Sequence, residues 1–283
     1  MGPSTPHRRH AAQVYRIRRA IAATAILLVV AVGWSAVGPG GGEEATTTTT
    51  SSSTSTTLPA LPPCSPDADN VIAQDPKTAW ATILVDTQRA IPASYGPGDL
   101  HNISEAGFPF TDGVALRGFV MPDLEALRLA AEAAGSPIRI LVGYRSYVTQ
   151  QDLFERRTNE LGASEAGSRV ARPGHSEHQL GTTVDITSAN LTDVDQSWGA
   201  TPTGQWIASH AHEYGFIVSY PSGASERTCY DFEPWHLRYV GREEAAAVIE
   251  ANLTLREYLW SLEQTAASAI AGSAPTTGVT GAG

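Results

Sequence analysis

Two short stretches of the sequence carry side chains that can bind a metal ion. The first runs from Pro173 to Asp185 and contains His178, and the second is the run from Glu233 to His236. Imidazole nitrogens and carboxylate oxygens are donors that catalytic zinc sites use, usually with three protein ligands. A further carboxylate beside such a site can accept a proton from water. These residue types predict a hydrolytic Zn²⁺ site with His178, Asp185 and His236 as ligands and Glu233 as base.

The charge of the chain argues against nucleic-acid binding. The 283 residues carry 19 basic and 29 acidic side chains, a formal net charge of −10. Five of the basic and two of the acidic residues precede residue 64, which leaves 14 basic against 27 acidic residues in the remainder. Nucleic-acid affinity depends on Lys and Arg contacts to phosphate. An acidic domain of this kind is therefore expected to have no nucleic-acid partner.

The N-terminal region has the pattern of a membrane signal. Residues 1–19 contain five arginines and no acid, and residues 20–38 are uncharged and largely apolar. A helix of that length at about 1.5 Å per residue comes close to the roughly 30 Å hydrocarbon core of a bilayer. Because basic flanks stay inside, we expect residues 1–19 in the cytoplasm, a single-pass transmembrane signal-anchor at 20–38, and the rest outside the cell membrane. A cleaved signal peptide, which would release a secreted protein, is the alternative.

The composition then divides the remainder into a linker, a domain and a tail. Residues 39–63 are rich in Gly, Thr, Ser and Pro, and residues 265–283 are rich in Ala, Gly, Ser and Thr. Such segments bury too little apolar surface to offset their ordering entropy, so both are predicted to be disordered. The folded domain is expected at 64–264, and we expect it to be a monomer.

The chain has two cysteines, Cys64 and Cys229, both on the expected outer side of the membrane. In an oxidising compartment such a pair suggests one disulfide. Two separate buried thiols remain possible from the sequence, and so does Cys229 as a zinc ligand.

Helical and strand patterns alternate irregularly along the domain. The predicted helices and strands are, in order, helix Pro122–Ala134, strand Ile138–Val142, helix Gln150–Leu161, strand Val184–Thr187, helix Thr203–Tyr214, strands Phe216–Tyr220 and His236–Val240, and helices Arg242–Ala251 and Leu255–Leu262. Short, unevenly spaced strands differ from a repeating βαβ pattern. We therefore expect an α+β fold with a small antiparallel sheet flanked by helices and the zinc site on the sheet.

Three motifs together resemble a known family. They are Ser176-x-His178-x-x-Gly181-x-Thr183-x-Asp185, Glu233-x-Trp235-His236 and, upstream, Gly143-Tyr144-Arg145-Ser146-Tyr147-x-x-Gln150. In this order they resemble the VanY-type D-alanyl-D-alanine carboxypeptidases, zinc peptidases of the group that also includes lysostaphin-like enzymes and hedgehog domains. Thr183 stands where that family usually has alanine.

The resemblance implies a role for each matching residue. His178, Asp185 and His236 match the zinc ligands. Glu233 matches the general base. Arg145 matches the arginine that meets the oxyanion or the substrate carboxylate, for which its planar fork is suited.

Two further positions, Ser176 and Gln150, match places near the substrate. The implied activity is removal of the C-terminal D-Ala from peptidoglycan stem peptides outside the membrane. An L,D-carboxypeptidase or an endopeptidase on the same scaffold is the alternative, and so is a non-catalytic zinc domain that binds cell-wall peptide. A non-catalytic domain is expected to lack the base, whereas Glu233 is present.

Overall fold

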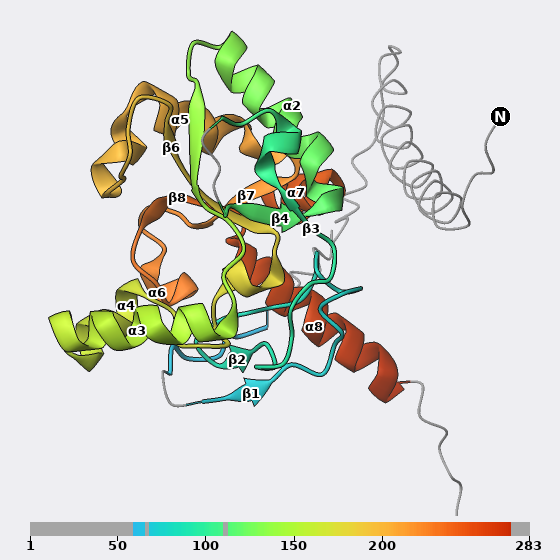
Figure 1. Ribbon diagram of the computed structural model, residues 1–283. Coiled ribbons are helices and arrows are strands. Elements are labelled where there is room, and N and C mark those ends of the chain that lie inside the picture. Colours follow the sequence, from blue (N-terminus) through green and yellow to red (C-terminus); the bar gives the residue numbers. More distant parts are fainter. Residues whose placement is uncertain (1–58, 66–67, 110–112, 273–283) are drawn as a thin grey trace, which may run out of the picture. The chain divides into compact units, whose positions relative to one another are not determined.

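A four-stranded sheet lies at the centre of the described part of the chain (Figure 1). The computed structural model describes residues 59–65, 68–109 and 113–272. The expected membrane segment at 20–38 lies outside these ranges, as do residues 273–283 and most of the expected linker. No helix within the described ranges is long and apolar enough to cross a membrane.

The central sheet has the order β5-β6-β8-β7, and every neighbouring pair in it is antiparallel. Its strands are β5 (Ile138–Val142), β6 (Thr183–Ser188), β7 (Phe216–Tyr220) and β8 (Glu233–Tyr239). Two small two-stranded sheets complete the strands described, a parallel pair β1 (Asn70–Val71) and β2 (Arg89–Ala90), and an antiparallel pair β3 (Leu100–Asn102) and β4 (Ala115–Arg117). The expected α+β fold with a small antiparallel sheet is confirmed.

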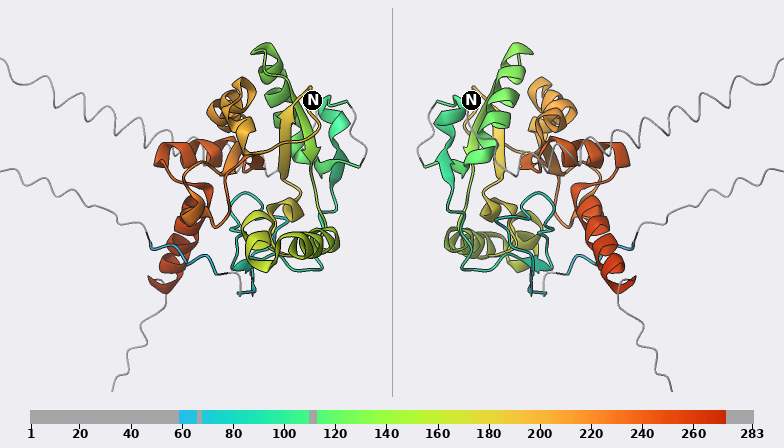
Figure 2. Two further views of the ribbon diagram at one scale, coloured as in Figure 1. Left: turned by 90° about the vertical axis from the view of Figure 1, so that its left-hand side faces the viewer. Right: turned by 90° about the vertical axis from the view of Figure 1, so that its right-hand side faces the viewer.

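Helices surround this sheet on several sides (Figure 2). The α-helices are α2 (Met121–Ala133), α3 (Tyr147–Leu161), α4 (Ala163–Arg169), α5 (Pro202–His210), α6 (Ser225–Thr228), α7 (Arg242–Ala251) and α8 (Leu255–Gly272). Short 3₁₀ helices connect them, namely η1 (Ile103–Ala106), η2 (Gly118–Val120), η3 (Glu177–Leu180), η4 (Gln196–Ala200) and η5 (Ala211–Tyr214).

Side chains alternate along a strand, so one face of the sheet packs into the core while the other carries polar side chains. Val184 and Ile186 of β6 and Leu237 of β8 are fully buried in the main core, together with residues of α2 and α5. Asp185 lies between the two buried β6 residues and is paired in register with His236 of β8. The register therefore places a carboxylate and an imidazole side by side on the face away from that core.

The structure extends several predicted elements. α3 begins at Tyr147 rather than Gln150, because the side chain of Ser146 accepts a hydrogen bond from the backbone N–H of Thr149 and caps the helix. β8 begins at Glu233 rather than His236. α8 continues to Gly272, beyond the expected domain end at 264, through an alanine-rich stretch of high helix propensity.

The N-terminal part of the described chain is tied to the C-terminal helix. Cys64 and Cys229 form a disulfide across 165 positions of sequence. Just before it, the carbonyl of Ala60 accepts a hydrogen bond from Trp260 and that of Pro62 accepts one from Arg256. These contacts order the last residues of the segment expected as linker, so the folded part begins before position 64.

Candidate metal centre

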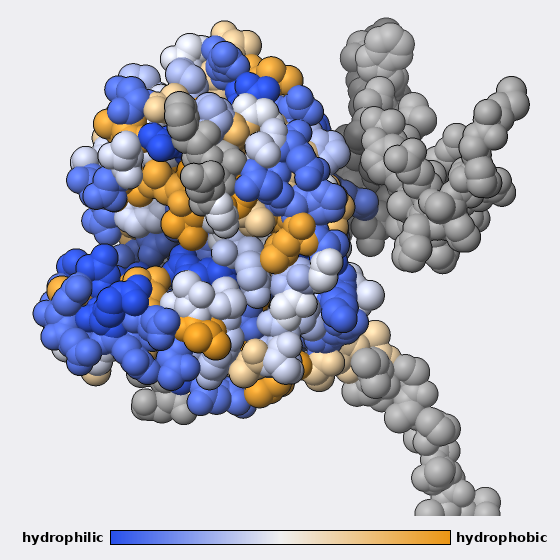
Figure 3. All heavy atoms as spheres, in the orientation of Figure 1, coloured by the Kyte–Doolittle hydropathy of each residue, from blue (hydrophilic) through white to orange (hydrophobic). Residues whose placement is uncertain are grey.

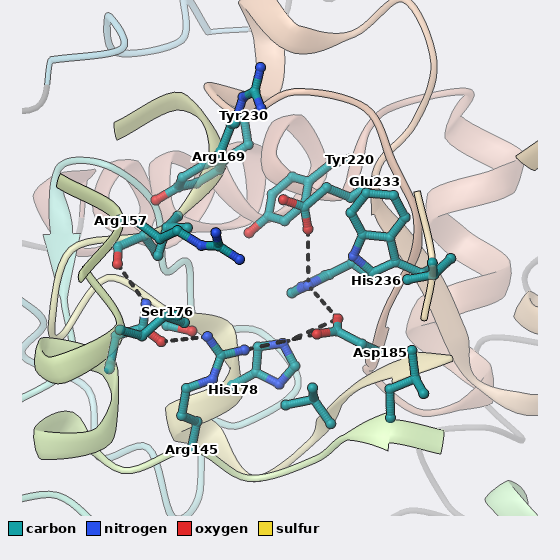
Figure 4. Close-up of a pocket in the computed structure, with 18 of the residues that line it drawn as sticks. Arg145, Arg157, Arg169, Ser176, His178, Asp185, Tyr220, Tyr230, Glu233 and His236 are labelled. Carbon is teal, nitrogen blue, oxygen red and sulfur yellow. Dashed lines mark hydrogen bonds and ion pairs between the residues drawn. The ribbon is translucent and has the colours of Figure 1, made fainter. Parts of the chain in front are cut away.

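The three predicted metal ligands lie together on the sheet face opposite the main core. One donor atom from each of His178, Asp185 and His236 falls within 4.8 Å of the others. Asp185 Oδ1 lies 3.3 Å from Nε2 of His178 and 3.3 Å from Nδ1 of His236. In Figure 4 the rings of His178 and His236 both face this carboxylate.

The chemistry of these donors fits Zn²⁺. Asp185 Oδ1 is buried, and neither neighbouring ring gives it a well-formed hydrogen bond. Burial would raise the pKa of Asp185, but the two imidazoles lower it well below its ordinary range, so the group is a carboxylate. Nδ1 of His178 lies 2.8 Å from the carbonyl oxygen of Gly143; as a donor to it, this nitrogen leaves Nε2 with a free lone pair. Two imidazole nitrogens and one carboxylate oxygen are a donor set suited to catalytic zinc.

Glu177, which sequence reasoning missed, supports the second histidine. Its Oε2 lies 3.0 Å from Nε2 of His236 and accepts a hydrogen bond from the Ser219 hydroxyl. Its Oε1 accepts a hydrogen bond at 2.9 Å from Arg238, which is fully buried. Burial would raise the pKa of Glu177, but Arg238, His236 and Ser219 lower it to about 2. Glu177 is therefore ionised and accepts a hydrogen bond from Nε2 of the ligand His236.

A break in the strand register brings Glu233 to the same space. Tyr220 pairs with Glu233 and Val218 with Leu237, so β8 has extra residues opposite this part of β7. Such an irregularity redirects side chains that strict alternation would separate. As a result Glu233 Oε2 lies 3.5 Å from Nδ1 of His236. Burial and nearby Asp185 raise the pKa of Glu233, while His236 and Arg145 lower it, and the result is about 7.

The predicted substrate residues border the metal donors. Arg145 follows β5, and its Nη2 lies 3.9 Å from Asp185 Oδ2. Gln150 of α3 accepts a hydrogen bond from Arg145 at 3.0 Å and donates one to the carbonyl of Ala171 at 2.6 Å. Ser176 is buried and lines the same cavity. All seven predicted site residues therefore line one cavity.

That cavity is a cleft of about 550 Å³. Figure 3 shows the surface hollowed beside the hydrophilic region over α3 and α4. Tyr220, Tyr230 and Trp235 also line the cleft, and Trp235 packs against the main core as well. Neither tyrosine belongs to the motifs on which the zinc site was predicted.

One glycine of the first motif has a clear structural reason. Gly181 ends η3 with φ of 74°, and a Cβ there would lie 3.0 Å from both Arg117 and Pro97. A left-handed residue in so tight a space has to be glycine. The turn fixes the chain between His178 and Asp185.

A comparison with protein families matches residues 114–242 to the VanY family, described as D-alanyl-D-alanine carboxypeptidase. Among curated proteins, the D-alanyl-D-alanine carboxypeptidase of Enterococcus faecalis is 32% identical over 226 residues, which cover 72% of this chain and 80% of the relative.

Solved structures of an LD-carboxypeptidase and a D,D-pentapeptidase also superimpose on the chain. The LdcB LD-carboxypeptidase superimposes with a TM-score of 0.62 at 34% identity, covering 72% of this chain and 94% of LdcB. A variant of the vancomycin-resistance D,D-pentapeptidase VanY in complex with Zn(II) superimposes with a TM-score of 0.54 at 32% identity, covering 64% of this chain and 99% of the VanY chain.

Proposed function

Since the chain belongs to the VanY family of D-alanyl-D-alanine carboxypeptidases and is a zinc metallocarboxypeptidase, we propose that it removes the C-terminal D-alanine from peptidoglycan stem peptides. The observation that supports this most is the pair of side chains flanking the metal donors. Glu233 Oε2 is 3.5 Å from the ring of His236, and Arg145 Nη2 is 3.9 Å from Asp185. A base and a cation at one metal centre suit hydrolysis beside a terminal carboxylate.

Within this proposal His178, Asp185 and His236 hold the zinc ion. When bound, Zn²⁺ polarises the scissile carbonyl and lowers the pKa of water. Glu233 accepts a proton from the attacking water and passes it to the leaving amine. Its side chain is 15% exposed and lines the cleft, so it can reach a water molecule at the metal centre.

Arg145 binds the terminal carboxylate of the substrate. Its guanidinium is largely buried and retains donors beyond the hydrogen bond to Gln150. Gln150 uses both ends of its amide on Arg145 and Ala171, so we assign it to orienting the arginine. Ser176, which lines the same cleft, offers its hydroxyl to the substrate.

The proposed location is outside the cell membrane. It is supported by the basic and apolar N-terminal sequence and by the Cys64–Cys229 disulfide, which is typical of oxidising compartments. Protease treatment of intact spheroplasts should digest the domain if it is membrane-anchored and external. Full protection of the domain until the cells are lysed would contradict this location.

The test of the activity is digestion of purified stem pentapeptide and stem tetrapeptide, with the products identified by mass spectrometry. Release of D-alanine from the pentapeptide supports the D,D-carboxypeptidase. An L,D-carboxypeptidase is the second candidate because LdcB superimposes on this chain with a TM-score of 0.62. Cleavage of the tetrapeptide alone would establish that candidate instead, and cleavage restricted to cross-linked dimers would indicate an endopeptidase.

A further inference from the structure

The cleft at the metal centre opens into a second cavity of about 860 Å³. The two cavities share six lining residues, namely Arg157, Arg169, Val170, Val194, Glu233 and Trp235. Arg145 lines the first cavity only. If Arg145 holds the C-terminal carboxylate, the amino-terminal part of the peptide leaves the metal centre towards the shared residues. On that condition the second cavity is positioned to receive the upstream residues of the substrate.

Two cations stand at this junction in a domain that is otherwise acidic. Arg157 belongs to α3 and Arg169 ends α4. Their side chains are 49% and 55% exposed. Figure 4 draws both across the pocket from Asp185, with Arg157 extending into the pocket.

The ion pairs that these two arginines now form leave them able to bind a ligand. Arg157 pairs with Glu160 at 2.7 Å and Arg169 with Glu165 at 2.9 Å, each within a single helix. Arg169 also lies 3.9 Å from Asp231, which is outside its helix. Exposed ion pairs of this kind contribute little to stability, so a ligand can replace them. Each guanidinium also has five N–H donors in a fork that suits a carboxylate.

Acidic side chains restrict where an anion can bind. Asp193 lines the first cavity, and Asp195 and Asp231 line the second. Asp195 accepts hydrogen bonds from the N–H and hydroxyl of Ser197, and Asp231 lies 3.9 Å from Arg169. Because Asp231 lies beside Arg169 and Glu233 also lines the junction, a substrate carboxylate is favoured only within hydrogen-bond reach of the two guanidinium groups.

We propose that Arg157 and Arg169 form a carboxylate-binding subsite for the upstream part of the stem peptide, an inference that rests on the proposed function. The preferred substrate class is then an acidic peptide with a free carboxylate a few residues before the scissile bond. The same peptide with that carboxylate converted to an amide loses the charge-assisted hydrogen bonds.

The experiment compares two synthetic stem pentapeptides that differ at one group, the α-carboxylate of the second residue, a γ-linked D-glutamate. One peptide carries the free acid and the other the amide. The wild-type protein should show a kcat/KM at least about ten-fold higher for the acid, as expected for losing hydrogen bonds to a charged group. In the double variant Arg157→Ala, Arg169→Ala this ratio should fall to about one.

The matched control is Arg156→Ala, because Arg156 is an exposed neighbour of the same charge that lines neither cavity. It should keep the wild-type ratio, which separates local binding from long-range attraction. Equal kcat/KM of the wild type on both peptides would overturn the subsite alone. A preference that survives the double variant would also overturn it. Hydrolysis of neither peptide would overturn the proposed function and the subsite with it.

Discussion

Glu177 Oε2 lies 3.0 Å from Nε2 of His236, on the side of the ring away from Asp185. A carboxylate only accepts hydrogen bonds, so this contact keeps the proton on Nε2 and leaves the lone pair of Nδ1 facing Asp185. The buried guanidinium of Arg238 balances the charge of Glu177 at 2.9 Å. The orientation of one metal ligand thus depends on a pair of charges that bind no metal.

Replacing Glu177 by glutamine should weaken zinc binding by about 10–100-fold, the usual loss when a ligand histidine loses its outer partner. Competition with a chromophoric chelator measures the affinity. Ser219→Ala is the matched control, because it removes one hydrogen bond to Glu177 and leaves the carboxylate in place. Its loss should be the smaller one. Unchanged zinc affinity in a folded Glu177→Gln protein would contradict the role given to Glu177.

Metal removal should abolish hydrolysis, since no other described group of His, Cys, Asp and Glu side chains offers a metal site. The purified protein should contain about one zinc per chain. Exhaustive chelation should stop cleavage of the pentapeptide, and added Zn²⁺ should restore it. Chelation should also lower the melting temperature, because zinc stabilises only the folded state that holds the site. Full activity in protein verified to be metal-free would refute the zinc site.

Changing Glu233 to alanine should lower kcat by about 10²–10⁴-fold, the range typical for loss of a general base. Zinc content and melting temperature should stay close to those of the wild type, because Glu233 is assigned as base and not as ligand. Metal analysis and steady-state kinetics on the same preparation give both values. Loss of zinc together with activity would show that Glu233 has been assigned the wrong role.

The motifs carried enough information to predict the metal donors, because His178 and Asp185 lie close in sequence and the pairing of β6 with β8 aligns Asp185 with His236. They could not reveal Glu177 as a partner of His236, since that contact spans 59 positions and depends on how η3 packs against β8. The register break that turns Glu233 towards His236 was equally hidden, because strand pairing is a tertiary property.

The secondary structure shows the same division between local and long-range information. β5, β7 and α7 have the predicted bounds, since apolar runs and glycines mark their ends. The second cavity involves side chains from α3, α4 and β8, which no local pattern relates to one another.

Removing the disulfide should destabilise the domain. Replacing Cys64 and Cys229 together by serine frees a closed loop of 165 positions, and the free energy of unfolding should fall by about 2–4 kcal/mol. Denaturant unfolding followed by tryptophan fluorescence measures the change. A reductant should destabilise the wild type by a similar amount and leave the double variant unaffected. Equal stability of wild type and variant would indicate that the bridge does not form in the protein.

Arg145 provides the sharpest test of carboxypeptidase action. If it binds the terminal carboxylate, the enzyme should cleave a peptide ending in D-Ala-D-Ala at least about ten-fold faster than its C-terminal amide, because the amide forms no charge-assisted pair. Arg145→Lys should remain impaired despite its charge, since an ammonium cannot reproduce the planar fork or the hydrogen bond geometry to Gln150.

Initial rates on the acid and the amide, for wild type and Arg145→Lys, complete this comparison. Arg139, on β5 and outside the cleft, supplies the control Arg139→Lys, which should behave as the wild type does. Equal wild-type rates on the two peptides would mean that the free carboxylate is not recognised. Cleavage would then be that of an endopeptidase, and Arg145 would act on the oxyanion.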